Sequence, residues 1–192
     1  MLRRLPLIPT LIVLLAVSAM VRLGLWQLDR MHQKEVLLAR YVAAGKASEV
    51  SFEGWAEPGD TRGDEAWTYR RVWTDCVKVL GLSARAGRNA QGETGWAHVA
   101  ECRLQQGAQL SVVLGWSNSP AEAGWAGGLV HGTIGPARSL VADPPLAGLQ
   151  ANARPDPNDI PNNHLSYALQ WFAFAAAALA IYLLALRKRL AV

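Results

Sequence analysis

Residues 165–186 constrain this chain more than any other segment, because they are almost wholly apolar over a length that can cross a bilayer. The exceptions are Ser166, Gln170 and two tyrosines. At about 1.5 Å of rise per residue, a helix of this length spans roughly 30 Å, the thickness of the hydrocarbon core. We therefore predict a transmembrane helix. His164 directly precedes it, and an imidazole at the membrane surface is a ready metal ligand, so a function at that surface is the first hypothesis.

A second apolar segment, residues 5–21, lies near the amino terminus. Trp26 follows it at a position where an aromatic side chain anchors a span at the interface. We predict a transmembrane helix over residues 5–26. Beyond Trp26 apolar residues recur at helical spacing without Gly or Pro, so the helix is expected to continue to about residue 43.

A cleaved signal peptide is the alternative for this amino-terminal segment, because Arg3 and Arg4 form a charged start. The apolar run is longer than the hydrophobic region that is usual in such a peptide. This length favours a retained membrane helix.

The two spans are expected to place both termini in the cytoplasm. Arg187, Lys188 and Arg189 directly follow the second span, and basic residues that flank a span stay on the cytoplasmic side. Basic residues lie on both sides of the first span and give no direction. Because the number of spans is even, the residues between them are predicted to be exported.

Between the spans, residues 45–160 are predicted to form one β-rich domain outside the membrane. With 51% hydrophobic and 18% charged residues, the chain is too apolar to be disordered. β-Branched and aromatic residues in partial alternation predict strands, and the short connections predict an antiparallel meander. The fold class is thus membrane α+β, with two transmembrane helices flanking a small, mainly antiparallel β domain. The predicted strands are residues 67–80, 95–104, 109–116 and 129–134, with connections at residues 81–92 and 117–128.

The two cysteines, Cys76 and Cys102, both fall in the segment that is expected to be exported. An oxidising compartment permits a disulfide between them. Two buried thiols are the alternative, and the sequence leaves both interpretations open.

Patterns of catalytic residues are largely absent, so the chain is not predicted to be an enzyme. Residues 115–119 contain serines but lack the second glycine of a nucleophile elbow, and no glycine-rich phosphate loop occurs. The four histidines are scattered, without the spacing of a dedicated metal centre. The net charge of +4 comes partly from residues flanking the membrane and indicates no nucleic-acid partner.

Two motifs at opposite ends of the chain carry a resemblance to a known family. LGLWQLDR at residues 23–30 resembles the opening motif of the Surfeit locus protein 1 family, and NNHLSYA at residues 162–168 resembles its closing motif. YRRV at residues 69–72 is similar to a strand motif of that family. The resemblance covers the full chain, with two departures. Leu114 stands where the family usually has Arg, and Gln170 where it usually has Thr.

The resemblance implies a role in assembling haem-copper cytochrome c oxidase. Bacterial members are understood to bind haem a and to favour its delivery to the large subunit of the oxidase. It also implies a bacterial inner-membrane location, a periplasmic central domain, and the large subunit and other assembly factors as partners. The alternative is a membrane scaffold that stabilises an assembly intermediate without binding haem.

On this resemblance His164 is the expected axial ligand of the haem iron. Its alternative role is that of a helix-start histidine that bonds to local backbone or lipid headgroups. Arg30, with Arg22 and Lys34, would face the propionates, or else these side chains would simply be solvated or snorkelling. Trp171 lies on the same helical stripe as His164, and small residues on that stripe leave room for a flat macrocycle or for close helix packing. The stripe comprises His164, Ala168, Trp171, Ala175 and Tyr182.

Overall fold

A computed structural model describes residues 6–54, 65–121 and 123–191. The chain divides into two compact units. The first, here called the helix pair, comprises the described residues up to Leu37 and from Pro161 onward. The second, called the sheet domain, comprises those of residues 38–160.

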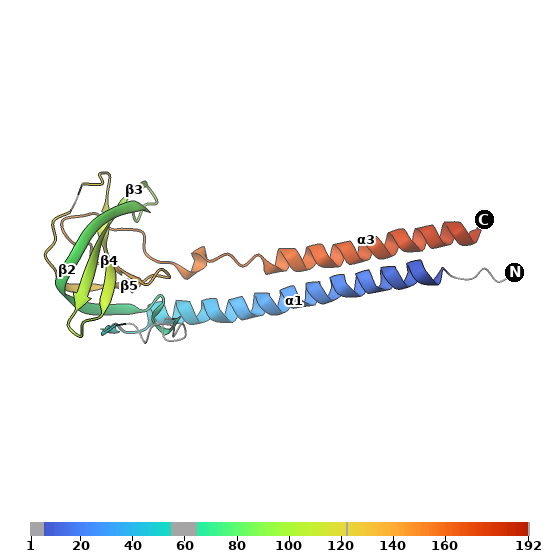
Figure 1. Cartoon of the computed structure of the whole chain (residues 1–192), viewed down its shortest axis with the longest axis horizontal. Coiled ribbons are helices and arrows are strands. Elements are labelled where there is room, and N and C mark those ends of the chain that lie inside the picture. The colour runs from blue at the N-terminus through green and yellow to red at the C-terminus, as the bar shows by residue number, and fades with distance from the viewer. Residues whose placement is uncertain (1–5, 55–64, 122, 192) are drawn as a thin grey trace. The chain divides into compact units, whose positions relative to one another are not determined.

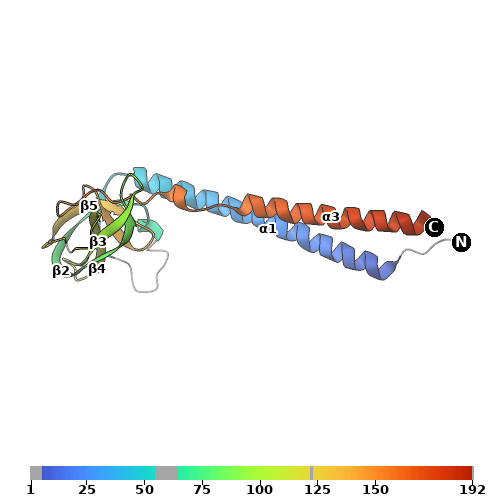
Figure 2. The same ribbon diagram turned by 90° about the horizontal axis from the view of Figure 1, so that it is seen from above.

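Two long antiparallel helices build the helix pair. Helix α1 spans Leu7–Lys46, of which residues 38–46 belong to the sheet domain, and helix α3 spans His164–Ala191. Figures 1 and 2 show the two helices side by side, with the amino end of α1 near the carboxyl end of α3. By length and composition both can cross a membrane.

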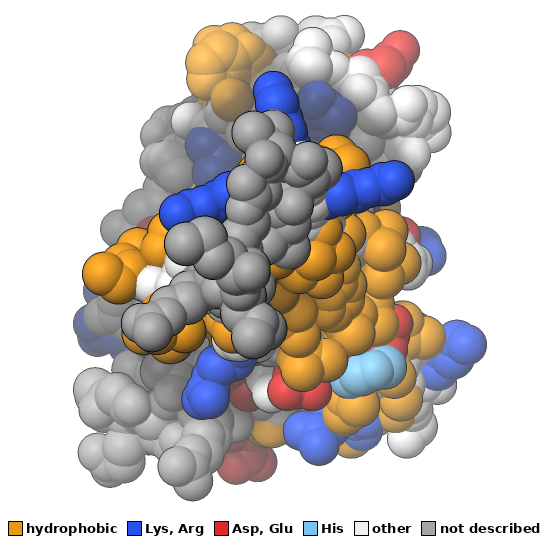
Figure 3. Space-filling model, turned by 90° about the vertical axis from the view of Figure 1, so that its right-hand side faces the viewer, with side chains coloured by type: hydrophobic (Ala, Val, Ile, Leu, Met, Phe, Trp, Pro, Cys, Tyr) orange, Lys and Arg blue, Asp and Glu red, His pale blue; other side chains and the backbone are white. Residues whose placement is uncertain are grey.

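The large apolar side chains of the helix pair point outward rather than into a protein core. Leu11, Leu15, Leu169 and Ile181 are each at least 60% exposed, and Figure 3 shows hydrophobic side chains over the visible helix surface. A helix that is apolar all round is stable only where lipid or protein covers it. The exposed surface therefore fits a bilayer, as the sequence predicted.

Small residues let the two helices approach closely. A Cβ atom added to Gly24 of α1 would meet the Phe172 ring of α3 at less than the normal contact distance. Ala168 is fully buried and Ala175 is 5% exposed. Toward the other end of the pair, the hydroxyl groups of Thr10 and Tyr182 share a hydrogen bond. Packing of small residues and interhelical hydrogen bonds are the forces that hold helices together in lipid.

We expect Gly24→Ala to destabilise the helix pair by roughly 1–3 kcal/mol, the usual cost of overpacking. The added methyl group would collide with the Phe172 ring. Thermal unfolding of the purified protein in detergent measures the effect. The double variant Gly24→Ala/Phe172→Leu should recover part of the loss, because a shorter side chain vacates the space. A single variant as stable as the wild type would show that this contact is not tight.

The sheet domain contains one six-stranded mixed sheet. Its order is β1-β2-β3-β4-β6-β5, and β2 also pairs with β5, which closes the five longer strands into a barrel. Strands β2 to β4 form an antiparallel meander, whereas β4 and β6 pair in parallel. This order is that of the OB-fold, a five-stranded Greek-key barrel that by itself assigns no function. The strands are β1 (Val50–Ser51), β2 (Arg71–Arg88), β3 (Thr94–Leu104), β4 (Gln109–Ser117), β5 (Gly128–Ile134) and β6 (Ser139–Ala142).

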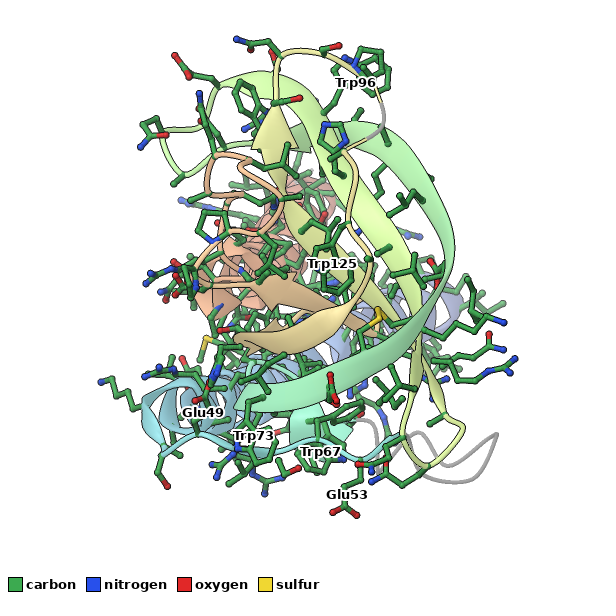
Figure 4. The ribbon with its side chains drawn as sticks, turned by 90° about the vertical axis from the view of Figure 1, so that its left-hand side faces the viewer. Glu49, Glu53, Trp67, Trp73, Trp96 and Trp125 are labelled. Atoms are coloured by element: carbon green, nitrogen blue, oxygen red, sulfur yellow. A yellow bond between two sulfur atoms is a disulfide. The ribbon has the colours of Figure 1, made fainter. Side chains whose placement is uncertain are left out.

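Alternating apolar residues of these strands fill the barrel. From Arg71 to Cys76 every second residue of β2 is buried, which is the period of a strand with one face in a core. Trp67 and Trp125 pack against this core, whereas Trp73 and Trp96 are 40% and 36% exposed (Figure 4). The barrel interior is formed by Phe52, Val72, Cys76, Ala100, Cys102, Leu104, Leu110, Val112, Leu114, Val130, Ile134, Leu140 and Ala142.

A disulfide between Cys76 and Cys102 lies in this core and joins the neighbouring strands β2 and β3. Both residues are buried, at 2% and 0% exposure. Of the two interpretations that the sequence allowed, the structure contains the disulfide.

The four predicted strands and the β2–β4 meander are confirmed, but the prediction for residues 81–92 is wrong. Strand β2 continues through Gly81 to Arg88. Gly81 follows a shift in the β2–β3 register, and no atom outside its neighbours lies within 4 Å of an added Cβ. A glycine at such an irregularity bends a strand without ending it. Strand β2 also begins four residues later than expected, because Tyr69 has a left-handed φ of 64°.

Candidate functional site

His164 is the first residue of α3, and its side chain reaches across to α1. Its Nδ1 lies 2.7 Å from Oε1 of Gln27. An amide oxygen only accepts hydrogen bonds, so Nδ1 carries the proton and donates it. In a neutral imidazole this leaves the lone pair on Nε2, which is the arrangement of a histidine that can bind a metal.

Asn162 ties the start of α3 to the next turn of α1. Its Nδ2 donates to the Met31 carbonyl oxygen at 3.5 Å, and its Oδ1 is buried without a hydrogen-bond partner among the described residues. The first intrahelical bond runs from the Tyr167 amide to the Asn163 carbonyl. Asn162 therefore anchors the segment before α3 and, with Gln27, fixes where His164 points.

The helical stripe that runs from His164 to Tyr182 is occupied by helix packing. Ala168 and Ala175 are buried within the helix pair, and Tyr182 bonds to Thr10. A macrocycle therefore cannot lie on the alanines while the helices stay in contact. Of the two interpretations of this stripe, close packing is the one that the structure contains.

An aromatic flank runs along one edge of that stripe on α3, and we define it by Trp171, which belongs to the stripe, and by Tyr167 and Phe174 beside it. The rings of Trp171 and Phe174 meet edge to face, with centroids 6.3 Å apart. Tyr167 is 50% and Phe174 57% exposed, while Trp171 is half-buried. At about 100° per residue, Trp171 stands only about 20° from His164 around the helix, with the other two rings farther to the same side.

Two of the three cationic candidates, Arg30 and Lys34, follow Gln27 along α1, whereas Arg22 precedes it. Arg30 is one turn farther and donates to Gln33 at 2.7 Å, with no acidic partner among the described residues. Lys34, seven residues beyond Gln27, returns to the same face of the helix. The structure thus brings His164, Trp171 and these cations to one end of the helix pair. Gln27 itself was not predicted. The sequence feature that could have indicated Gln27 is its place as a polar residue directly after an apolar span.

A separate pocket of about 550 Å³ lies within the sheet domain. The rings of Tyr41 and Tyr69 meet there at 4.9 Å, and Arg154 pairs with Asp143 at 2.7 Å. Burial raises the pKa of both tyrosines. Arg71 lines the pocket too, so part of the strand motif faces it, but none of the predicted site residues does.

In the described part of the chain, no three His, Cys, Asp or Glu side chains gather as a metal site would require. His98 bonds to Ser117 at 2.8 Å, His131 to Glu49 at 3.0 Å and His32 to Glu35 at 3.2 Å. These histidines therefore have local partners of their own.

The model of the SURF1 family, the Surfeit locus protein 1 family, matches residues 14–176, which include most of α1, the whole sheet domain and the first part of α3. The chain belongs to the SURF1 family. Members of this family are non-enzymatic assembly factors of cytochrome oxidase, so the resemblance that the sequence motifs carried is confirmed. A comparison with curated proteins found no match. Leu114, one of the two departures from the family pattern, is fully buried in the barrel.

Proposed function

We propose that this SURF1-family protein binds haem a through His164 and holds it for insertion into the large subunit of cytochrome c oxidase. The observation that carries the proposal is the His164–Gln27 hydrogen bond, which leaves the lone pair of Nε2 available to bind a metal. Axial histidines of haem proteins bind iron through such an imidazole. An acceptor that takes the proton of the other ring nitrogen usually supports such a ligand.

The surroundings of His164 fit a flat macrocycle on the outside of the helix pair. The aromatic flank offers exposed rings beside the proposed ligand. Arg30 and Lys34 would hold the propionates by charge-assisted hydrogen bonds. Haem a, when bound, would supply an iron that accepts the His164 imidazole, and the chain would contribute holding and orientation alone.

A partly exposed site suits a carrier. His164 is half-buried, and the flank beside it opens to the exterior of the helix pair. Binding through one side chain on an open surface leaves a path for handing the ligand to another protein. Such transfer needs no catalytic group of this chain.

The outer face of the sheet domain supports a contact with a partner such as the oxidase or another assembly factor. Trp73 and His131 are cross-strand neighbours of β2 and β5, and Leu129 and Val77 are 55% and 51% exposed. Exposed apolar groups clustered in this way mark interaction surfaces.

A scaffold that binds no haem is the second candidate, favoured by the closed packing of Ala168 and Ala175. A pair of helices that is complete without a ligand can stabilise a partner by itself. Titration of the purified protein in lipid nanodiscs with haem a separates the two functions. Saturable 1:1 binding supports the carrier, whereas absorption that grows without saturation supports the scaffold.

We further propose a bacterial inner-membrane location with both termini in the cytoplasm and the sheet domain in the periplasm. The Arg187, Lys188 and Arg189 cluster at the end of α3 supports this orientation. Alkaline phosphatase is active only after export. Fused near Gly92 it should be active, and fused after Val192 it should be inactive. The reverse pattern would contradict the orientation.

A further inference from the structure

We infer that Gln27 is a positioning residue that selects the tautomer of His164 and aims its Nε2 away from α1. This inference rests on the proposed function for its purpose, but the tautomer itself can be measured without haem. Gln27 itself would not contact the haem. It acts through the imidazole alone.

The hydrogen bond between Gln27 and His164 determines which ring nitrogen of His164 carries the proton. Oε1 of Gln27 lies 2.7 Å from Nδ1 of His164, and this oxygen accepts but cannot donate. The Nδ1-protonated tautomer gains the hydrogen bond, while the other tautomer would set two lone pairs against each other. A net hydrogen bond of ordinary strength shifts such an equilibrium about fivefold. Low polarity at a membrane helix increases that preference.

Gln27 is held in place by its neighbours on α1. Gly24, three residues earlier, packs against Phe172. Met31, four residues later, accepts the hydrogen bond from Asn162. Residues at this spacing lie on one face of a helix, so the Gln27 amide sits between two fixed interhelical contacts. The acceptor is therefore in position before any ligand arrives.

Other side chains at position 27 would change the length, the hydrogen-bond acceptor or the charge at this contact. Asn has a side chain one methylene shorter than Gln, and Leu of similar size has no acceptor. Glu keeps the length and the acceptor but adds a negative charge, which strengthens the pull on the Nδ1 proton. The substitutions of Gln27 by Asn, Leu and Glu thus test the length of the side chain, its hydrogen-bond acceptor and its charge, respectively.

A purely structural role is the competing explanation, since a polar bond between membrane helices also holds them together. A structural tie would change stability when it is lost. It would not change the properties of the imidazole. Measurements on His164 itself therefore distinguish the two roles.

The first experiment is ¹⁵N nuclear magnetic resonance of the haem-free, full-length protein with labelled histidine, in detergent. The His164 signal is assigned by its loss in His164→Ala. We expect the Nδ1-protonated tautomer to dominate in the wild type and the Nε2-protonated form to rise about fivefold in Gln27→Leu. Gln170→Leu is the matched control, because Gln170 is exposed on α3. An unchanged tautomer ratio in Gln27→Leu overturns the inference.

The second experiment uses the same proteins loaded with haem a. Gln27→Leu should weaken haem binding by about 10-fold to 100-fold, the usual effect of losing the hydrogen-bond partner of a ligating histidine. Gln27→Glu should raise the iron–histidine stretching frequency in resonance Raman spectra, because the ligand becomes more basic. Loss of thermal stability with an unchanged frequency would show a structural tie only. If the wild type takes up no haem while the tautomer shift is found, the proposed function fails and the positioning role stands.

Discussion

His164→Ala is expected to lose haem a from the purified protein while leaving it inserted and folded. The substitution removes the Nε2 donor but keeps a good helix former at the first residue of α3. Loss of the hydrogen-bond partner of a ligating histidine alone costs about 10-fold to 100-fold in metal affinity. Loss of the ligand itself should cost more, on the order of a hundredfold or above. Haem content per protein, measured by absorption after purification, gives the result.

Two further variants separate ligation from general damage. His32→Ala removes a histidine that is exposed on α1 and bonds only to Glu35 in the described structure, so it should keep its haem. Arg30→Ala should weaken binding less than His164→Ala, because a solvent-exposed charge pair contributes little. A His164→Ala protein with undiminished haem and an unchanged spectrum would exclude His164 as the ligand.

Removal of the disulfide is expected to lower the free energy of unfolding of the sheet domain by about 3.5 kcal/mol. Cys76 and Cys102 are 26 residues apart, and the estimate is the chain entropy that a loop of this length returns to the unfolded state. The double variant Cys76→Ser/Cys102→Ser would show it in denaturant unfolding of the full chain.

Wild-type protein under reducing conditions provides the control for the two serine substitutions. Both routes should give a loss of similar size, because each opens the same loop. Mass spectrometry of unreduced peptides must find the Cys76–Cys102 cross-link in the oxidised wild type. Two free thiols, or a loss below about 1 kcal/mol, would contradict the account of this core.

The sequence pattern predicted those elements that depend on residues close together in the chain. The apolar run at residues 165–186 and the alternation in β3 and β4 each depend on neighbours in sequence. Closure of the barrel by β2 and β5 joins Arg71 to Thr133, and no short-range pattern indicates it. The parallel pairing of β4 with β6 was missed for the same reason, since the four residues Ser139–Ala142 are too short to give a strand period.

The candidate site divides in the same way. His164 could be predicted because it stands at the start of an apolar helix within a family-like motif. Gln27 could not, because its role depends on the register between α1 and α3, across 137 residues of sequence. The alanine stripe was equally undecided by the sequence. Only the contact of Gly24 with Phe172 and the burial of Ala168 and Ala175 identify it as packing surface.

The pigment carried by the wild-type protein decides whether the chain is a haem carrier. The full-length chain would be purified from cells that make haem a, and its pigment extracted and identified by chromatography and mass spectrometry. We predict haem a at close to one molecule per chain. Protein that carries no haem, from cells in which haem a is demonstrably made, would contradict the carrier function and leave the scaffold in its place.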